Sequence, residues 1–328
     1  MTVICRTPEL GILRAAYYFP SETYTIEQWA QLINQPSTLV EKMHAAGLRH
    51  YHVAEQESPV ELAWQAASRC CAGIDGKSID VLIVASSAGC SRPPVPLMIH
   101  EELRRRLGMR PSGQAFSLVD MHCASLMGAI QLTHRLFALH SDWKRALLVS
   151  VDKMYEELTR NIGHHAIQSD GAAAILIERG SASSCCEAVA IRIEPRYAKG
   201  FHKPPELQQH FMASYHIVAY GLLSSMLENI GWRFSDVDAF MFPNMNPAPY
   251  SALIERAGIH KEKIFMQTEN VARHGYANCS DFIVNFADWL RLRGPGERRI
   301  VGYASGTTGF FSAVAVTVHE GAVEAGSN

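Results

Sequence analysis

Strand-like apolar runs alternate with helical segments along the whole chain, and the same order of elements occurs twice. A helical segment at residues 59–71 leads to a continuously apolar strand at 80–86, and a longer helix at 213–230 leads to a similar strand at 237–242. Strands that are apolar along their whole length are typical of sheets covered by helices on both faces. The sequence therefore predicts an α/β protein made of two similar halves.

We place the division between these halves near residue 180, which gives an N-terminal half of 1–180 and a C-terminal half of 181–328. Further helices are expected at 124–140 and 279–293, and further strands at 146–151, 172–177, 188–195, 299–304 and 313–318. The stretch 196–207 has two adjacent prolines and no periodicity, so we expect a loop over a surface or a pocket mouth.

Composition excludes several classes of protein. The net charge is −2, and the short basic run Arg104–Arg106 lies in an amphipathic segment, so no nucleic-acid partner is indicated. No apolar run approaches the ~20 residues that a membrane helix needs, and the N-terminus does not resemble a signal peptide. The eight cysteines show no metal-binding spacing. We expect a cytoplasmic protein without a metal site.

Residues 117–130, SLVDMHCASLMGAI, carry the strongest chemical signal. A strand-like run ends at Cys123, and a helix with small residues at its start follows. A thiol at a helix N-terminus is favoured as thiolate, and the free N–H groups of such a turn can hold an oxyanion. The segment therefore suits an acyl-thioester nucleophile. Taken alone, it suits a buried cysteine at a tight turn equally well.

Other segments resemble the ketoacyl synthase III family of the thiolase superfamily. The matching stretches are LGILRAAYYFPSETYT at 10–25, AAGLRHYHVA at 45–54, SDGAAA at 169–174 and ASGTTG at 304–309, in the same order as in that family. The resemblance implies a five-layered αβαβα sandwich in which Cys123 carries the acyl group. It also implies that the backbone N–H groups of Cys123 and Gly306 form the oxyanion hole. A homodimer paired through a strand near 115–119 is implied as well.

Two signatures of that family are altered. Where its decarboxylating members have a histidine, this chain has Pro243, followed by Asn244 at one of the family's two asparagines; a one-residue shift would instead put Asn244 at the histidine position. In the second signature, Asn278 matches the asparagine of the ketosynthases. Tyr276 and Asp281 stand where an acyl-transferring branch has its histidine and its acid. We therefore treat all four polar residues as candidate catalytic residues.

Two histidines near these signatures are expected to be outside the chemistry. His274 lies outside both family patterns and is expected to be structural. His122 precedes Cys123 and is expected to point away from it, because successive residues of an extended segment face opposite sides.

Loss of the histidine favours simple acyl transfer over decarboxylative condensation. Condensation needs side-chain donors that stabilise an enolate, and proline has none. The leading prediction is an acyltransferase that moves an acyl group through Cys123 in polyketide-like or fatty-acid-like specialised biosynthesis. A carbon–carbon bond-forming ketosynthase, a weakly active subunit of a heteromeric complex and a hydrolase are the alternatives.

The acyl donor is expected to be a thioester of an acyl carrier protein or of coenzyme A, and no tightly bound cofactor is expected. In this family a tryptophan of the early helical region stacks on the adenine of coenzyme A. Residues 39–47 contain no tryptophan, and Trp29 lies upstream, where we expect it to pack a helix. Carrier protein is therefore favoured as the partner. A paralogous subunit is the other possible partner.

Overall fold

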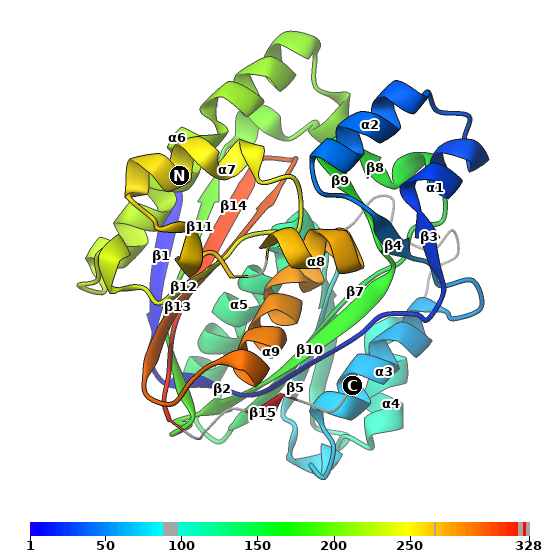
Figure 1. The fold of residues 1–328 in the computed structure, drawn as a ribbon. Helices are drawn as coiled ribbons and strands as arrows, with labels where there is room; N and C mark the ends of the chain where they lie inside the picture. The colour runs from blue at the N-terminus through cyan, green and yellow to red at the C-terminus, as the bar shows by residue number, and fades with distance from the viewer. Residues whose placement is uncertain (88–97, 266, 321–323, 326–328) are drawn as a thin grey trace.

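Two β-sheets form the frame of the protein in the computed structural model, which describes residues 1–87, 98–265, 267–320 and 324–325 (Figure 1). The six-stranded sheet has the order β15-β2-β10-β7-β5-β6, and the five-stranded sheet has the order β1-β11-β14-β13-β12. The strands of the first sheet are β2 (Leu10–Tyr18), β5 (Val81–Ala85), β6 (Gln114–Leu118), β7 (Arg145–Asp152), β10 (Gly171–Arg179) and β15 (Glu324–Ala325). Those of the second are β1 (Thr2–Thr7), β11 (Ser184–Ile193), β12 (Ala239–Met241), β13 (Arg298–Gly306) and β14 (Phe310–Val318).

The predicted repeat is visible in the pairing of the strands. In the first sheet, β5 pairs with β7 in parallel, and β10 and β2 follow in antiparallel order. In the second sheet, β12 pairs with β13 in parallel, and β14 and β11 follow in antiparallel order. The two terminal strands cross over, since β1 belongs to the second sheet and β15 to the first. A division at residue 180 falls between β10 and β11 and remains our proposal for the boundary.

Helices form three layers around the two sheets, as Figure 1 shows. Helices α5 (Ser125–Leu139) and α9 (Asp281–Leu292) lie between the sheets and pack on both. Helices α3 (Pro59–Cys70) and α4 (Ile99–Leu107) cover the outer face of the first sheet. Helices α6 (Pro205–Asn229) and α7 (Ala248–Ala257) cover the outer face of the second. The architecture is thus the predicted five-layered αβαβα sandwich.

The apolar runs of the sequence reflect this double covering. In β10, Ala173, Ile175 and Ile177 face the central helices, whereas the intervening Ala172 and Ala174 face α3. Alternate residues of a strand point to opposite faces, so a strand buried on both faces must be apolar throughout. Removing this apolar surface from water is the main favourable term in folding.

Smaller elements form a cap beside the sandwich. They are β3 (Thr23–Thr25), α1 (Ile26–Leu32), α2 (Ser37–Ala45), β4 (His50–His52), β8 (Asn161–Ile162), β9 (Ala166–Ile167) and α8 (Gln267–His274). Trp29 is fully buried in α1, and its indole N–H donates to the Glu157 carbonyl at 3.0 Å. Trp29 therefore packs a helix, as predicted.

The segment predicted as a loop at 196–207 differs in part from the structure. It contains two short 3₁₀ turns, and α6 already begins at Pro205 rather than near residue 213. Proline suits the first position of a helix because the N–H it lacks would have no intrahelical partner there. None of the helices in the described ranges is both long and apolar enough to cross a membrane.

Candidate active site

Cys123 lies in a 3₁₀ turn, His122–Ala124, that connects β6 to α5. The residue is 8% exposed, and α5 begins two residues later. The backbone of His122 is in the left-handed region, with φ of 49°. The expectation that His122 continues an extended strand is therefore wrong, because the chain turns sharply just before the cysteine.

The turn between α8 and α9 brings Tyr276 and Asn278 to Cys123. The hydroxyl of Tyr276 donates to the Cys123 sulfur at 2.7 Å, and the thiol lies 3.9 Å from Oδ1 of Asn278. The Nδ2 group of Asn278 is buried and has no hydrogen-bond partner among the residues that the structure describes. Gly275 permits this turn, with φ of 65°, and a Cβ there would lie 2.9 Å from the Ile167 carbonyl oxygen. An amide N–H without a partner beside the nucleophile is a donor available to a substrate oxygen.

Gly306, at the end of β13, packs directly against the turn that holds the cysteine. A Cβ at this position would lie 2.7 Å from the His122 Cβ and 3.1 Å from the Met121 carbonyl oxygen. Only glycine allows the backbone of this loop to come so close. This close packing of the Gly306 loop on the cysteine turn is compatible with the prediction that Gly306 and Cys123 contribute N–H groups to one oxyanion hole.

Asp281 and Asn244 form a separate buried group behind the Tyr276 turn. The Asp281 carboxylate accepts hydrogen bonds from Asn244 N at 2.7 Å, Asn244 Nδ2 at 3.2 Å and Ala277 N at 2.9 Å. Among the described residues, neither Asp281 nor Asn244 forms a hydrogen bond to the Cys123 sulfur. The structure therefore places these two predicted site residues in a position to hold the Tyr276 turn rather than to touch the sulfur.

The electrostatic environment keeps Cys123 protonated. Burial raises its pKa to about 12; the hydrogen bond from Tyr276 lowers the pKa, while the charges of Asp152 and Asp281 raise it further. The predicted thiolate is thus not the resting form, since desolvation outweighs the helix start. Burial also raises the pKa of Asp281 to about 7, although its three hydrogen bonds lower the pKa.

Asp152 is a residue of the site that the sequence analysis missed. It ends β7 and is 1% exposed, and it accepts hydrogen bonds from Ser86 Oγ at 3.0 Å and from Ser87 N and Oγ at 2.9 Å. The Cys279 N–H, in the same turn as Asn278, donates to it at 3.4 Å. The sequence does contain a sign of this role, because a charged residue at the end of a buried strand indicates a buried polar contact.

His274 is structural, as predicted. Its ring and that of His52 both stack on Phe19, at centroid distances of 4.5 and 4.6 Å. Its Nδ1 lies 3.2 Å from Nε2 of His52, and burial lowers its pKa to about 3. A pKa this low makes the imidazole a weak base, and both of its ring nitrogens are engaged by His52 and Arg273.

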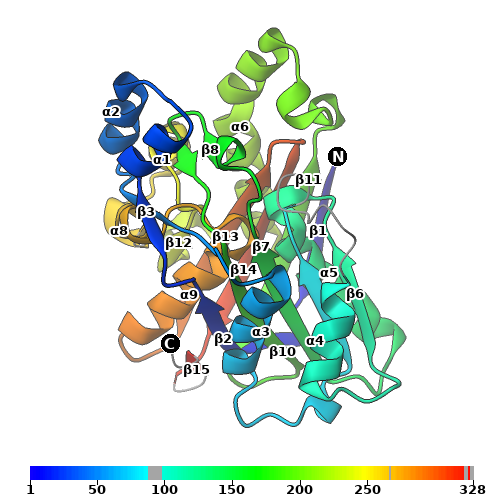
Figure 2. The same cartoon turned by 90° about the vertical axis from the view of Figure 1, so that its right-hand side faces the viewer.

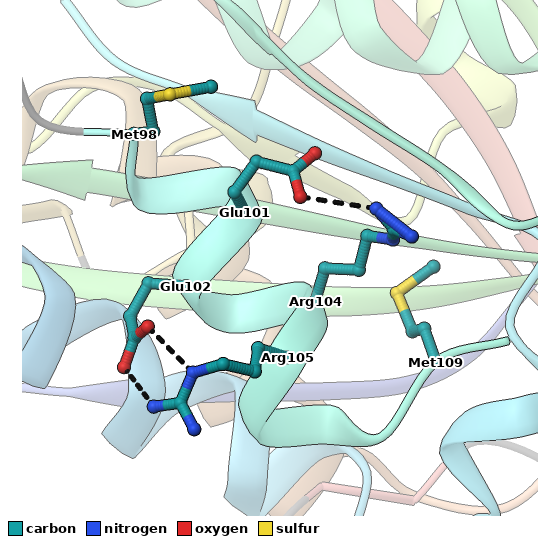
Figure 3. A pocket seen from close by; sticks show the side chains of 6 residues that line it. All are labelled: Met98, Glu101, Glu102, Arg104, Arg105 and Met109. Carbon is teal, nitrogen blue, oxygen red and sulfur yellow. Dashed lines mark hydrogen bonds and ion pairs between the residues drawn. The ribbon is translucent and has the colours of Figure 1, made fainter. Parts of the chain in front are cut away.

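A surface hollow along α4 lies apart from this site (Figure 3). Its charged groups are already paired, Arg104 with Glu101 at 3.1 Å and Arg105 with Glu102 at 2.6 Å. The basic run Arg104–Arg106 therefore lies on a helix whose arginines form salt bridges with neighbouring glutamates. In the described ranges no group of three or more His, Cys, Asp or Glu residues is placed to hold a metal ion.

Comparison with known proteins gives a consistent result. No family profile matches the chain. The β-ketoacyl-[acyl-carrier-protein] synthase III of Staphylococcus saprophyticus is 25% identical over 303 residues, which cover 89% of this chain and 90% of that protein. The crystal structure of 3-oxoacyl-(acyl carrier protein) synthase III from Pseudomonas aeruginosa superposes with a TM-score of 0.80 at 18% identity, covering 96% of this chain and all of that one. ChlB3, an acyltransferase, gives a TM-score of 0.80 at 18% identity over 96% of this chain and 99% of its own.

The duplicated five-layered sandwich of this chain is the thiolase-like fold of these solved structures. In sequence, the chain is similar to a β-ketoacyl-[acyl-carrier-protein] synthase III over most of its length.

Proposed function

We propose that this protein is an acyltransferase that passes an acyl group from a thioester through Cys123 to a hydroxyl, amine or thiol acceptor in specialised biosynthesis. The observation that carries the proposal is the 2.7 Å hydrogen bond from Tyr276 to the Cys123 sulfur. This hydrogen bond provides a proton donor at the sulfur, which acyl transfer needs. It does not provide the side-chain hydrogen-bond donors that would stabilise an enolate.

In the loading step, the Cys123 thiol attacks the carbonyl carbon of the donor thioester. A bond forms between Sγ and the acyl carbon, the bond from that carbon to the donor sulfur breaks, and the proton of Cys123 leaves with the donor thiol. The Asn278 Nδ2 group and the backbone N–H groups at Cys123 and Gly306 stabilise the oxyanion. Because Cys123 is a neutral thiol at rest, its proton must move as the new bond forms.

In the transfer step, the acceptor attacks the acyl-cysteine, and the bond between the acyl carbon and Sγ breaks. Tyr276 gives its phenol proton to the leaving sulfur and receives the proton of the acceptor, so the enzyme returns to its starting state. Burial raises the pKa of Tyr276 well above its ordinary value, so the phenol is protonated and ready to donate. General acid catalysis of this kind contributes about 10²–10⁴-fold.

Decarboxylative condensation is disfavoured by the arrangement of the remaining polar groups. Pro243 replaces one enolate donor, and the Nδ2 group of Asn244 is engaged by Asp281. Of the two asparagines Asn244 and Asn278, only Asn278 has its side-chain amide beside the Cys123 sulfur. Loss of a single such donor lowers a rate by about 10²–10³-fold.

A carbon–carbon bond-forming ketosynthase is the second candidate. Two observations favour it, namely the partnerless Nδ2 group of Asn278 and the resemblance to a synthase III over 89% of the chain. A subunit of a heteromeric complex is a third, because β6 lies at the edge of its sheet and can extend it with a strand of another chain. We favour a homodimer formed through this edge and an acyl carrier protein or coenzyme A thioester as donor.

Parallel reactions with a butyryl thioester and a malonyl thioester test acyl transfer against condensation. We expect the butyryl group to be loaded onto the enzyme while carbon dioxide release from the malonyl thioester is slow or absent. The Pro243→His variant is the matched comparison, since it restores a donor where the decarboxylating relatives have one. Wild-type decarboxylation at ordinary turnover, of the order of 10 per second, would establish the ketosynthase reading instead.

A further inference from the structure

Lys203 is a buried cation that forms no ion pair with a carboxylate in the described ranges. It is 7% exposed, and its Nζ donates to the carbonyl oxygens of Gly200 and of Thr307, the latter at 2.7 Å. Its charge also lies 4.9 Å from the centre of the Phe211 ring. In the part of the chain that the structure describes, no acidic side chain forms an ion pair with it, and burial alone lowers its pKa. Buried charges are normally paired, because an unpaired one is costly.

Two further polar groups belong to the loop whose Thr307 carbonyl accepts from this lysine. Among the residues that the structure describes, the hydroxyls of Thr307 and Thr308 are buried and have no hydrogen-bond partner. The loop that ends in Lys203 packs against them, since a Cβ on Gly200 would lie 3.2 Å from Thr308 Cγ2 and 3.9 Å from Thr307 Oγ1. An ammonium group has three N–H donors, of which the two carbonyls use two. One ammonium and two hydroxyls at one place are therefore available to an anion.

This cluster adjoins the candidate active site. Thr307 directly follows Gly306, whose backbone packs against His122, the neighbour of Cys123. The positive charge of Lys203 also acts on His122, where it adds to burial in lowering the pKa of the imidazole. The cation thus lies near the turn that holds Cys123, on the side of His122 and the Gly306 loop.

We propose that Lys203, Thr307 and Thr308 form a subsite for a carboxylate carried by the substrate, so that the enzyme prefers an acyl thioester with a free carboxylate on its acyl chain. The proposal rests on acyl transfer through Cys123. A carboxylate on a short acyl chain lies only a few bonds from the thioester, which suits a subsite next to the oxyanion loop. The phosphate of a pantetheine arm lies at the far end of that arm and fits this position less well.

Binding measurements test the subsite independently of catalysis. The Cys123→Ala variant cannot be acylated at this position, so calorimetry on it can compare succinyl-coenzyme A with butyryl-coenzyme A, which differ by one carboxylate. We expect the succinyl thioester to bind more tightly. Adding Lys203→Met should weaken its binding about 10- to 100-fold, as for the loss of a charge-assisted hydrogen bond, and leave butyryl binding within about twofold. Lys199→Met, an exposed lysine of the same loop, is the control and should change neither.

The outcomes separate the subsite from the proposed function. Equal weakening of both thioesters by Lys203→Met would show that the lysine only clamps the two loops, and it would overturn the subsite. If succinyl- and butyryl-coenzyme A bind equally well, the subsite is also overturned, with one exception. The exception is that butyryl-enzyme transfers its acyl group faster to 3-mercaptopropionate than to propanethiol, and that this difference depends on Lys203. That result would place the carboxylate on the acceptor. Failure of wild type to acquire either a butyryl or a succinyl group would refute acyl transfer, while the binding comparison would still decide the subsite.

Discussion

The hydroxyl of Tyr276 and the sulfur of Cys123 are 2.7 Å apart, although one residue comes from the C-terminal half of the chain and the other from the N-terminal half. The contact forms where the turns that begin the two central helices, α5 and α9, meet between the sheets. A donor fixed at this distance stabilises negative charge on the sulfur and is placed to return a proton to it.

Removing the phenol of Tyr276 should make Cys123 less reactive. The hydrogen bond from Tyr276 lowers the Cys123 pKa against the stronger effect of burial. Without it the pKa should rise further, so that at pH 8 the fraction of thiolate falls about tenfold for each pKa unit gained. Alkylation by iodoacetamide, followed by mass spectrometry, should be several-fold slower in Tyr276→Phe than in wild type. Equal alkylation rates in both proteins would show that the hydrogen bond does not influence the sulfur.

Asp281 should make the protein less stable as the pH rises from about 4 to about 7. Its pKa is raised from the ordinary value of 3.8 to about 7 in the folded protein. In this range the unfolded chain has lost the proton while the folded protein retains it, so the free energy of unfolding falls with increasing pH. The loss is at most about 4 kcal/mol and is complete above pH 7.

The Asp281→Asn variant isolates this contribution. Asparagine has no ionisable group, so the difference in unfolding free energy between the two proteins should change between pH 4 and pH 7 and stay constant above it. Urea denaturation at a series of pH values measures it. A difference that is constant over the whole range would mean that Asp281 ionises at its ordinary pKa.

Gly306→Ala should impair both stability and acyl loading. The new Cβ would fall 2.7 Å from the His122 Cβ, so that the glycine loop or the cysteine turn must move. Overpacking of this kind costs about 1–3 kcal/mol, and displacement of an oxyanion donor lowers the rate by about 10²-fold. Gly294→Ala is the control, since no atom of the described residues lies within 4 Å of its Cβ. Wild-type loading by Gly306→Ala would exclude this loop from the oxyanion hole.

The edge strand β6 should mediate a homodimer. It ends the six-stranded sheet (Figure 2). The exposed residues Gln114 and Ser117 belong to this strand. Pairing of two copies of β6 would continue the sheet across a twofold axis and satisfy the backbone groups of the edge. Light scattering should give twice the chain mass at micromolar concentration. A stable monomer would contradict this, and assembly only with a paralogous chain would favour the heteromeric alternative.

The fold, and the position of Cys123 at the start of a central helix, could be predicted because they depend on local patterns. The apolar runs of β7 and β10 identify strands buried on both faces, and Cys123 and Gly306 lie in motifs with a resemblance to a known family. Tyr276 was placed in the site because it stands at the position of a family histidine. The structure adds the distance that makes it a donor to the sulfur.

The rest depends on burial and on long-range contacts that no local pattern contains. Asn244 matches a family asparagine, but only the structure shows that Asp281 engages its side chain. The expected thiolate at Cys123 was wrong because the sequence does not reveal how completely the sulfur is desolvated. Lys203 lay in a stretch without periodicity, and its neighbour Thr307 is more than a hundred residues away in the chain.

Intact-mass analysis of the protein after incubation with a butyryl thioester tests acyl transfer through Cys123 most directly. Wild type should gain the mass of one butyryl group, peptide mapping should place it on Cys123, and Cys123→Ala should gain none. Addition of an acceptor thiol should remove the group from wild type, more slowly in Tyr276→Phe. A wild-type protein that stays unmodified with butyryl and succinyl thioesters of both coenzyme A and carrier protein, or a Cys123→Ala variant that is acylated equally, would contradict the proposed function.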